Sequence, residues 1–490
     1  MPAEAGLRRN AMLLGAAGAI EFGLQAILPM LLVRRLDPTT FGQYRLLWLT
    51  ANTALSIAPA FMPTALFYFL PRAATGGRGA VIGNVLCYCL FAGAVAALVT
   101  SGWNPWMQSA VQRLFADTHG LSSAFLLFWI AASVADVLPT ADGQARWQAG
   151  ATIGVALLRT VLLVAAAVTG CDIQRLAIAI LLVAVCKLAS LLTYLARRGE
   201  LMRLRCDGPL LRLQLAYALP FALGNALFLL RAQGDQWIVI SLLTPALFAT
   251  FSVASVVQPV STLIRQPVIN AMMPRLNAAH ARGAGSDIAN LIARSNGASG
   301  MLLLPVLGAL YAAAPELVRL VYTDRYQDAA PVMQVYLVGM AINVLAVGHV
   351  LSAVGRGRYA AISSLYCLVL SVVVGIAGLR LFGLPGAALG SVCTLAVNEL
   401  WSLRVIARTI DVPVHALLAW RALGCTAAGT AAGLAGALWF GTHGGQAGLS
   451  MLASQALIYL SLFLPCFLLC GGRRQFERML GWRPSAALMS

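Results

Sequence analysis

Residues 227–275 read LFLLRAQGDQWIVISLLTPALFATFSVASVVQPVSTLIRQPVINAMMPR and contain two long apolar segments separated by a short turn. A helix of about 20 apolar residues is long enough to cross a bilayer. Arg231, Asp235 and Arg265 lie inside these segments. A charge at the bilayer centre costs roughly 2.5–3.5 kcal/mol on insertion scales, so such residues are usually kept for a function. The stretch predicts membrane-spanning helices with charges placed inside.

The turn in this stretch repeats a turn near the N-terminus. Residues 36–44 (LDPTTFGQY) match residues 243–251 (LTPALFATF) at an offset of 207, and each turn leads into an apolar segment that ends in Pro-Arg. A second match relates residues 141–147 to residues 353–359 at an offset of 212. The two halves start on the same side of the membrane, which indicates a parallel repeat with a pseudo-two-fold axis along the membrane normal.

The composition excludes a water-soluble fold. Of 490 residues, 60% are hydrophobic and 10% are charged, whereas soluble domains are about 25% charged. The net charge of +17 is carried almost entirely by arginine, and we attribute it to the positive-inside rule rather than to nucleic-acid binding. The ten cysteines are scattered through apolar segments, so neither a disulfide framework nor a metal site is predicted.

We therefore predict an all-α polytopic membrane protein with about fourteen transmembrane helices. Residues 1–205 and 206–411 form two six-helix lobes, and residues 412–490 form an extra helix pair with a cytoplasmic tail. Basic residues favour the predicted inner segments by 22 to 8, which places both termini in the cytoplasm. The predicted spans are 11–33, 44–70, 80–101, 121–140, 148–170, 173–196, 215–243, 248–272, 295–314, 331–354, 360–381, 386–404, 415–440 and 449–470.

Several segments resemble the polysaccharide-transporter branch of the multidrug/oligosaccharidyl-lipid/polysaccharide (MOP) flippase superfamily, the Wzx-type flippases. The matching segments are Phe41-Gly42-Gln43-Tyr44, Asp235 ahead of residues 248–254, Pro274-Arg275-Leu276, residues 317–326 with Asp328-Ala329-Ala330, residues 353–358, and Phe382-Gly383-Leu384-Pro385-Gly386-Ala387-Ala388. The resemblance implies two six-helix lobes and alternating access. It also implies outward flipping of undecaprenyl-diphosphate-linked sugar repeat units in a bacterial inner membrane, for exopolysaccharide, capsule or O-antigen synthesis. Membrane lipids and a polysaccharide polymerase or export machinery are the other expected partners.

Five side chains within the predicted spans are candidates for binding the diphosphate: Arg159, Lys187, Arg231, Arg265 and Gln258. Guanidinium groups match the geometry of phosphate oxygens. Pro267 favours a kink beside Arg265, and Gln258 lies seven residues earlier on the same helical face. The alternative interpretations are an Arg231–Asp235 pair that locks its helix, an Arg265 that reaches lipid head groups, and pairing of Arg159 and Lys187 with acids such as Asp136.

Five titratable residues are candidates for ion coupling: Glu21, Asp136, Asp235, His349 and Glu399. Glu21 is central in the first span, and Gln25 and Pro29 continue its helical face at intervals of four residues. Histidine changes charge near neutral pH. The alternative for Glu21 is an interhelical hydrogen bond from a neutral side chain, and the alternative for His349 is a hydrogen-bonded packing residue.

No enzyme motif is visible. The sequence lacks Gly-x-Ser-x-Gly, a Walker loop and HExxH, so we predict a transporter without cofactor or metal, driven by an ion or substrate gradient. A cation-coupled multidrug exporter of the same fold is the first alternative. A membrane polysaccharide polymerase or ligase is the second, and the short outer loops disfavour it.

Overall fold

The computed structural model describes residues 2–73, 77–104, 108–170, 172–345, 347–353, 357–443, 445 and 447–480. Within these ranges, the side chains of residues 2–8, 349, 352, 353, 357, 358, 360, 361, 479 and 480 are not described. Every regular element of the described residues is a helix. The chain divides into two compact units, residues 1–249 and residues 250–490.

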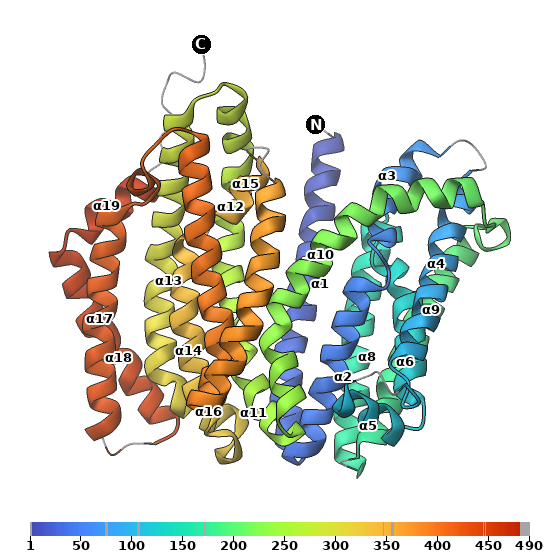
Figure 1. The fold of residues 1–490 in the computed structure, drawn as a ribbon, viewed down its shortest axis with the longest axis horizontal. Helices are drawn as coiled ribbons and strands as arrows, with labels where there is room; N and C mark the ends of the chain where they lie inside the picture. The colour runs from blue at the N-terminus through green and yellow to red at the C-terminus, as the bar shows by residue number, and fades with distance from the viewer. Residues whose placement is uncertain are drawn as a thin grey trace. The chain divides into compact units, whose positions relative to one another are not determined.

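In the described residues of the first unit, ten α-helices and three short 3₁₀ turns precede α11 (Pro245–Ala254) (Figure 1). The helices are α1 (Pro2–Val33), α2 (Pro38–Ile57), α3 (Met62–Phe69), α4 (Arg78–Val99), α5 (Ser109–Asp117), α6 (Leu121–Ala131), α7 (Leu138–Ala141), α8 (Ala145–Gly170), α9 (Ile173–Arg197) and α10 (Gly208–Leu242). The 3₁₀ turns are η1 (Leu70–Arg72), η2 (Ala132–Asp136) and η3 (Leu201–Arg203).

The unit boundary falls inside α11 (Pro245–Ala254), and the later helices form the second unit. They are α12 (Pro259–Ala281), α13 (Gly285–Tyr322), α14 (Ala329–Ala341), α15 (Gly348–Ala353), α16 (Gly357–Thr409), α17 (Trp420–His443), α18 (Leu449–Leu469) and α19 (Gly472–Leu480). The connecting 3₁₀ turns are η4 (Ser255–Val257), η5 (Asp324–Tyr326), η6 (Ile342–Leu345) and η7 (Val414–Leu417). In Figure 1, α17 and α18 run side by side as the predicted C-terminal pair.

The predicted class, an all-α protein that crosses the membrane many times, is confirmed. Twelve helices in the described residues are long and apolar enough to span a bilayer. One of them lies in α16, where Gly383 has the non-helical angles φ 66° and ψ −148°, so α16 is two helices joined at a kink. The shorter apolar helix Ala329–Leu345 is a further candidate. Counting the halves of α16 separately and adding this helix gives the predicted fourteen.

The helix α10 packs with the first unit, because it contacts α2, α3 and α4. The internal repeat instead suggests a lobe boundary between residues 205 and 206. Spatial compactness and sequence repetition are different criteria for dividing a chain into domains. The division into lobes at residues 1–205, 206–411 and 412–490 is therefore still a proposal.

A buried amide pair fixes the start of α10 against α4. The Asn84 Nδ2 donates to the Asp207 carbonyl oxygen at 3.0 Å and to Gln214 Oε1 at 3.1 Å, while the Asp207 N–H donates back to Asn84 Oδ1 at 2.8 Å. Asn84 and Gln214 are fully buried. One turn further along α4, the Sγ atoms of Cys87 and Cys206 lie 2.7 Å apart. The connector between α9 and α10 is therefore held on α4 by paired polar groups.

The two repeated turns touch each other at their helix starts. A Cβ atom at Gly42, in the first turn of α2, would lie 1.9 Å from the carbonyl oxygen of Pro245, the first residue of α11. Real Cβ atoms do not approach a backbone oxygen so closely. Residue 42 is therefore a glycine because the backbone of α2 contacts the backbone at the start of α11 there, with no room for a side chain.

The span that contains α2 and α3 is broken between these two helices. Ala60 and Phe61 have φ values of 46° and 63°, which non-glycine residues rarely adopt. The Phe61 ring stacks on Phe221 of α10, with ring centroids 5.5 Å apart. Such a conformation costs of order 1–3 kcal/mol per residue and persists only where the surroundings enforce it. The break makes α2 a helix separate from α3, and residues of α2 line the cavity described below.

Asp37 caps α2, and its replacement by alanine tests that cap. Its carboxylate accepts hydrogen bonds from the Thr39 and Thr40 N–H groups at 2.9 and 3.1 Å, and Pro38 follows at the first helical position. Partial burial opposes ionisation of Asp37, but hydrogen bonds from Thr40 and Thr39 outweigh it, so the pKa of Asp37 lies below its ordinary value of 3.8. We expect Asp37→Ala to lower the free energy of unfolding by about 1 kcal/mol at neutral pH.

The pH dependence distinguishes capping from other roles of Asp37. A lowered folded-state pKa means that the stabilisation is fully present above pH 3.8 and is lost as the pH falls through the folded-state value. Unfolding in detergent should therefore show a difference between wild type and Asp37→Ala at about pH 7 that shrinks towards about pH 3. An equal difference at both pH values would contradict the capping role.

Candidate functional site

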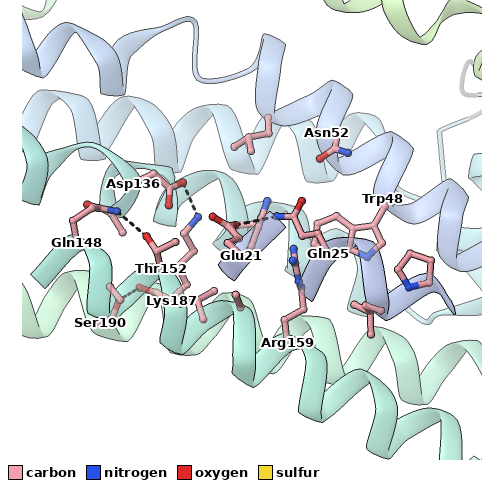
Figure 2. A pocket seen from close by; sticks show the side chains of 18 of the residues that line it. Glu21, Gln25, Trp48, Asn52, Asp136, Gln148, Thr152, Arg159, Lys187 and Ser190 are labelled. Atoms are coloured by element: carbon pink, nitrogen blue, oxygen red, sulfur yellow. Dashed lines mark hydrogen bonds and ion pairs between the residues drawn. The ribbon is translucent and has the colours of Figure 1, made fainter. Parts of the chain in front are cut away.

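A cavity of about 460 Å³ opens inside the first unit between α1, α2, α6, η2, α8 and α9. Its wall carries three basic residues, Arg45, Arg159 and Lys187, and two acidic residues, Glu21 and Asp136. Four of these five were predicted from the sequence as charges inside spans, and they come from four different elements. Helix packing has gathered them around one space (Figure 2).

The α1 wall of the cavity is a polar stripe with a period of four residues. Gln25 Nε2 donates to Glu21 Oε1 at 3.0 Å, and Pro29 lines the cavity one turn further along. Proline has no N–H, so the intrahelical hydrogen bond to the residue four positions earlier is missing at this turn. The stripe gives α1 both a carboxylate and an irregular backbone at the cavity.

Lys187 and Asp136 form an ion pair at the cavity wall. The Lys187 Nζ lies 2.7 Å from Asp136 Oδ2. The Lys187 side chain is 8% exposed and the Asp136 side chain is 52% exposed. The ammonium group also lies 4.3 Å from the ring centroid of Trp129 on α6, within the range of a cation–π interaction. Asp136 is the last residue of η2, a tight turn that interrupts the helix and turns its carboxylate into the cavity.

Arg159 is a buried cation with unused hydrogen-bond donors. Its side chain enters the cavity from α8, pointing towards Gln25 and Trp48 (Figure 2). The residue is 8% exposed, and its Nε and Nη2 atoms are buried with no hydrogen-bond partner among the described residues. Its Cζ lies 5.3 Å from the Trp48 ring centroid. Buried polar groups are nearly always hydrogen-bonded, and exceptions call for an explanation such as a ligand. A guanidinium with spare donors suits a bidentate oxyanion such as a phosphate.

Sequence reasoning missed the neutral and aromatic part of the wall, together with Arg45. Trp48 and Asn52 on α2, and Gln148 and Thr152 on α8, line the cavity beside the charges. Their spacing was a usable signal. Tyr44, Trp48 and Asn52 recur every four residues, and so do Gln148 and Thr152 on the face that carries Arg159. A search for polar stripes, rather than for charges alone, would have found them.

Two predicted residues of the first unit lie elsewhere. Arg231 and Asp235 are on α10, and neither is among the described residues that line the cavity. Asp235 is fully buried. Arg231 is partly buried, and its Cζ lies 5.5 Å from the Phe228 ring centroid, with Nε lacking a hydrogen-bond partner.

The second unit brings two other candidates together. Arg265 on α12 and Glu399 on α16 are both buried and interact electrostatically. Glu399 also accepts hydrogen bonds from the Val347 N–H at 3.0 Å and from Asn398 Nδ2 at 3.1 Å. The sequence did not predict this association. Gln258 stands where η4 meets α12, and the side chain of His349 lies outside the described residues.

Comparison with known proteins gives a family and a fold. The model of a family described as "Polysaccharide biosynthesis protein" matches residues 78–331. A search of curated protein sequences finds no significant match.

Three solved structures are similar to this chain. The lipid II flippase MurJ in an inward closed conformation is 11% identical, with a TM-score of 0.70 over 96% of this chain and 100% of that one. An inward-facing MATE family multidrug transporter of the MOP superfamily is 15% identical, with a TM-score of 0.63 over 79% and 94%. A MOP superfamily transporter from Pyrococcus furiosus is 15% identical, with a TM-score of 0.54 over 82% and 95%. At these identities the likeness establishes the fold.

Proposed function

We propose, from the premise that the chain belongs to the polysaccharide biosynthesis protein family within the MOP flippase superfamily, that it flips undecaprenyl-diphosphate-linked oligosaccharide repeat units outward across a bacterial inner membrane. The family and the fold are those of membrane transporters. The proposed mechanism is alternating access coupled to an ion gradient, with both termini in the cytoplasm. A polysaccharide polymerase or export machinery would take up the product.

The observation that carries this proposal is the Arg159 guanidinium. It is buried in the wall of a polar cavity, and two of its nitrogen atoms have no hydrogen-bond partner in the part of the chain that the structure describes. A lipid diphosphate offers oxygens to those donors, and Lys187 lies in the same wall. Tyr44, Trp48 and Trp129 add aromatic surface beside the cations. The cavity is larger than a diphosphate needs, since it holds about 460 Å³ and leaves room for the first sugar.

The other candidates keep proposed roles along the path. Arg231, Arg265 and Gln258 are proposed secondary contacts for the diphosphate. Glu21, Asp136, Asp235, Glu399 and His349 are proposed sites for the coupled cation. The multidrug-exporter alternative is served by the same two carboxylates of the cavity, Glu21 and Asp136, which would attract a cationic drug.

Reconstituted transport tests the proposal. The protein is placed in liposomes with a fluorescent undecaprenyl-diphosphate oligosaccharide, a pH or sodium gradient is imposed, and exposure of the sugar to an external lectin is followed. Gradient-dependent movement supports the flippase. Absence of movement by well-folded protein, together with efflux of cationic dyes from the same liposomes, would favour the drug exporter.

Replacing the two arginines outside the cavity, Arg231 and Arg265, tests the secondary contacts. We expect Arg231→Ala and Arg265→Ala each to lower surface polysaccharide roughly tenfold, because each removes a charged hydrogen bond of about 1.5–3 kcal/mol along the path. Membrane levels of protein are measured in the same cells. Arg113→Ala, which changes an exposed arginine on α5, is the matched control. Wild-type polysaccharide in both variants would contradict these two roles.

A further inference from the structure

We propose that Asp136 and the substrate diphosphate are alternative partners of Lys187, so that Asp136 takes up a proton when the diphosphate binds. This inference rests on the proposed function and adds a proton that moves outward together with the substrate. In the structure, Lys187 is neutralised by Asp136, whose Oδ2 lies 2.7 Å from the Lys187 Nζ. In the loaded cavity, the phosphate oxygens take that place, and the Asp136 carboxyl group becomes neutral.

The exposure of the two partners supports an exchange. The Lys187 side chain is 8% exposed, so a buried ammonium would be left without a counter-charge if Asp136 simply withdrew. Uncompensated buried charges are strongly unfavourable. The Asp136 side chain is 52% exposed to the cavity, so water, a proton and an incoming anion can all reach it. Trp129 lies 4.3 Å from Lys187 Nζ and restricts the directions from which a new partner can approach.

The other charged groups around Lys187 are accounted for in the described residues. Glu21 on α1 accepts a hydrogen bond from Gln25. Tyr44 and Arg45 face the cavity from α2, and Arg159 faces it from α8. Among the described residues, Asp136 is therefore the acid in direct contact with Lys187.

Asp142, which directly follows α7, does not compete for Lys187. It accepts a hydrogen bond from the Tyr194 hydroxyl at 2.7 Å and pairs with Arg78 at 2.7 Å. Because Asp142 has other partners, Asp136 is the carboxylate that a bound diphosphate would repel.

Charge balance gives the direction of the linkage. A diphosphate bound at Arg159 and Lys187 brings negative charge beside Asp136. A carboxylate that loses its cation and gains a neighbouring anion binds a proton more readily. The proton converts the carboxylate to a carboxylic acid, and no other bond changes. Because linkage is reciprocal, lower pH must then favour diphosphate binding. Each outward step moves one negative charge fewer than the diphosphate carries, and the membrane potential acts on the remainder.

Binding of a short-chain prenyl diphosphate without sugar tests this exchange. The full chain in lipid nanodiscs is titrated calorimetrically at about pH 6.5 and about pH 8.5, where one linked proton changes the Kd about tenfold per pH unit. The ionisation of the probe is the same for every variant. It therefore cancels in the ratio of wild-type Kd to Asp136→Asn Kd, and the pH dependence that is left comes from the protein. We expect this ratio to rise with pH, by up to about tenfold per unit.

A second readout measures the proton directly. Titrations in buffers of different ionisation enthalpy should show uptake of about one proton more by wild type than by Asp136→Asn. Asp136→Asn keeps the shape of the side chain, and thermal unfolding verifies that it folds. Asp117→Asn, which changes an exposed acid at the end of α5, should keep the wild-type pH dependence. Loss of the pH dependence in Glu21→Gln, with Asp136→Asn unchanged from wild type, would assign the proton to Glu21 and overturn the proposal.

The outcomes separate this inference from the proposed function. In one outcome, wild type binds the probe, Lys187→Met weakens binding, and the Kd ratio does not change with pH. This result overturns the proton exchange but supports the diphosphate site. No binding of the probe by folded wild type overturns both.

Discussion

Replacing Arg159 with alanine is expected to lower the rate of lipid-linked oligosaccharide translocation about a hundredfold or more. Truncating one partner of a buried charged pair costs about 2–5 kcal/mol, and each 1.36 kcal/mol corresponds to about tenfold. Among the described residues, the Arg159 Nε and Nη2 atoms have no hydrogen-bond partner. Removing them therefore sacrifices no hydrogen bond of the fold, and the thermal stability should change little. The loss would appear only when substrate is present.

Arg159→Lys is the matched variant. Lysine keeps the positive charge and loses the planar fork that holds two oxygens, so we expect a rate between those of wild type and Arg159→Ala. Initial rates in the liposome assay, normalised to folded protein, measure all three. If Arg159→Ala transports at the wild-type rate, the phosphate role of Arg159 is wrong, and the secondary contacts Arg231 and Arg265 become the leading sites.

Replacing Gly42 with alanine is expected to destabilise the first unit by about 3 kcal/mol or more, at the upper end of overpacking effects. The new methyl group would lie 1.9 Å from the Pro245 carbonyl oxygen. A backbone atom cannot move aside as a flexible side chain does, so α2 or the start of α11 must shift. Size-exclusion chromatography and thermal unfolding in detergent should show little folded protein.

Gly150→Ala is the control for this substitution. Gly150 lies within α8, and a Cβ there would meet nothing within 4 Å. Alanine favours a helix over glycine by about 1 kcal/mol, so this variant should be as stable as wild type or more stable. Normal folding of Gly42→Ala would show that the two repeated turns can separate without cost.

Much of the fold was predictable because the bilayer limits what an apolar segment can do. A segment of membrane length must form a helix to satisfy its backbone, so the helices and their number follow from hydropathy. The break at Ala60 and Phe61 was not predictable, because a left-handed conformation at non-glycine residues reflects tertiary contacts such as the Phe61–Phe221 stack. The packing of α10 with the first unit likewise depends on contacts with α2 and α4 that no local pattern records.

The charged residues of the candidate site were predictable from the sequence, but their arrangement around one cavity was not. Glu21, Asp136, Arg159 and Lys187 each stand out in an apolar segment, and the Lys187–Asp136 pairing was one of the alternatives. Which charges share a cavity depends on the rotation of each helix about its axis, and hydropathy leaves that rotation open. The same reason explains why the association of Arg265 with Glu399 came only from the structure.

The facing thiols of Cys87 and Cys206 have a practical consequence. Both are exposed, and their sulfur atoms lie 2.7 Å apart between α4 and the segment that precedes α10. An oxidant that removes two electrons and two protons from them joins these segments as a disulfide, and a reducing thiol releases it. Cys87 and Cys206 thus offer a reversible disulfide cross-link in the native chain. If the cross-linked protein is still active, the transport motion takes place in other helices. If activity is lost on oxidation and returns on reduction, the junction between α4 and the segment before α10 must move during transport.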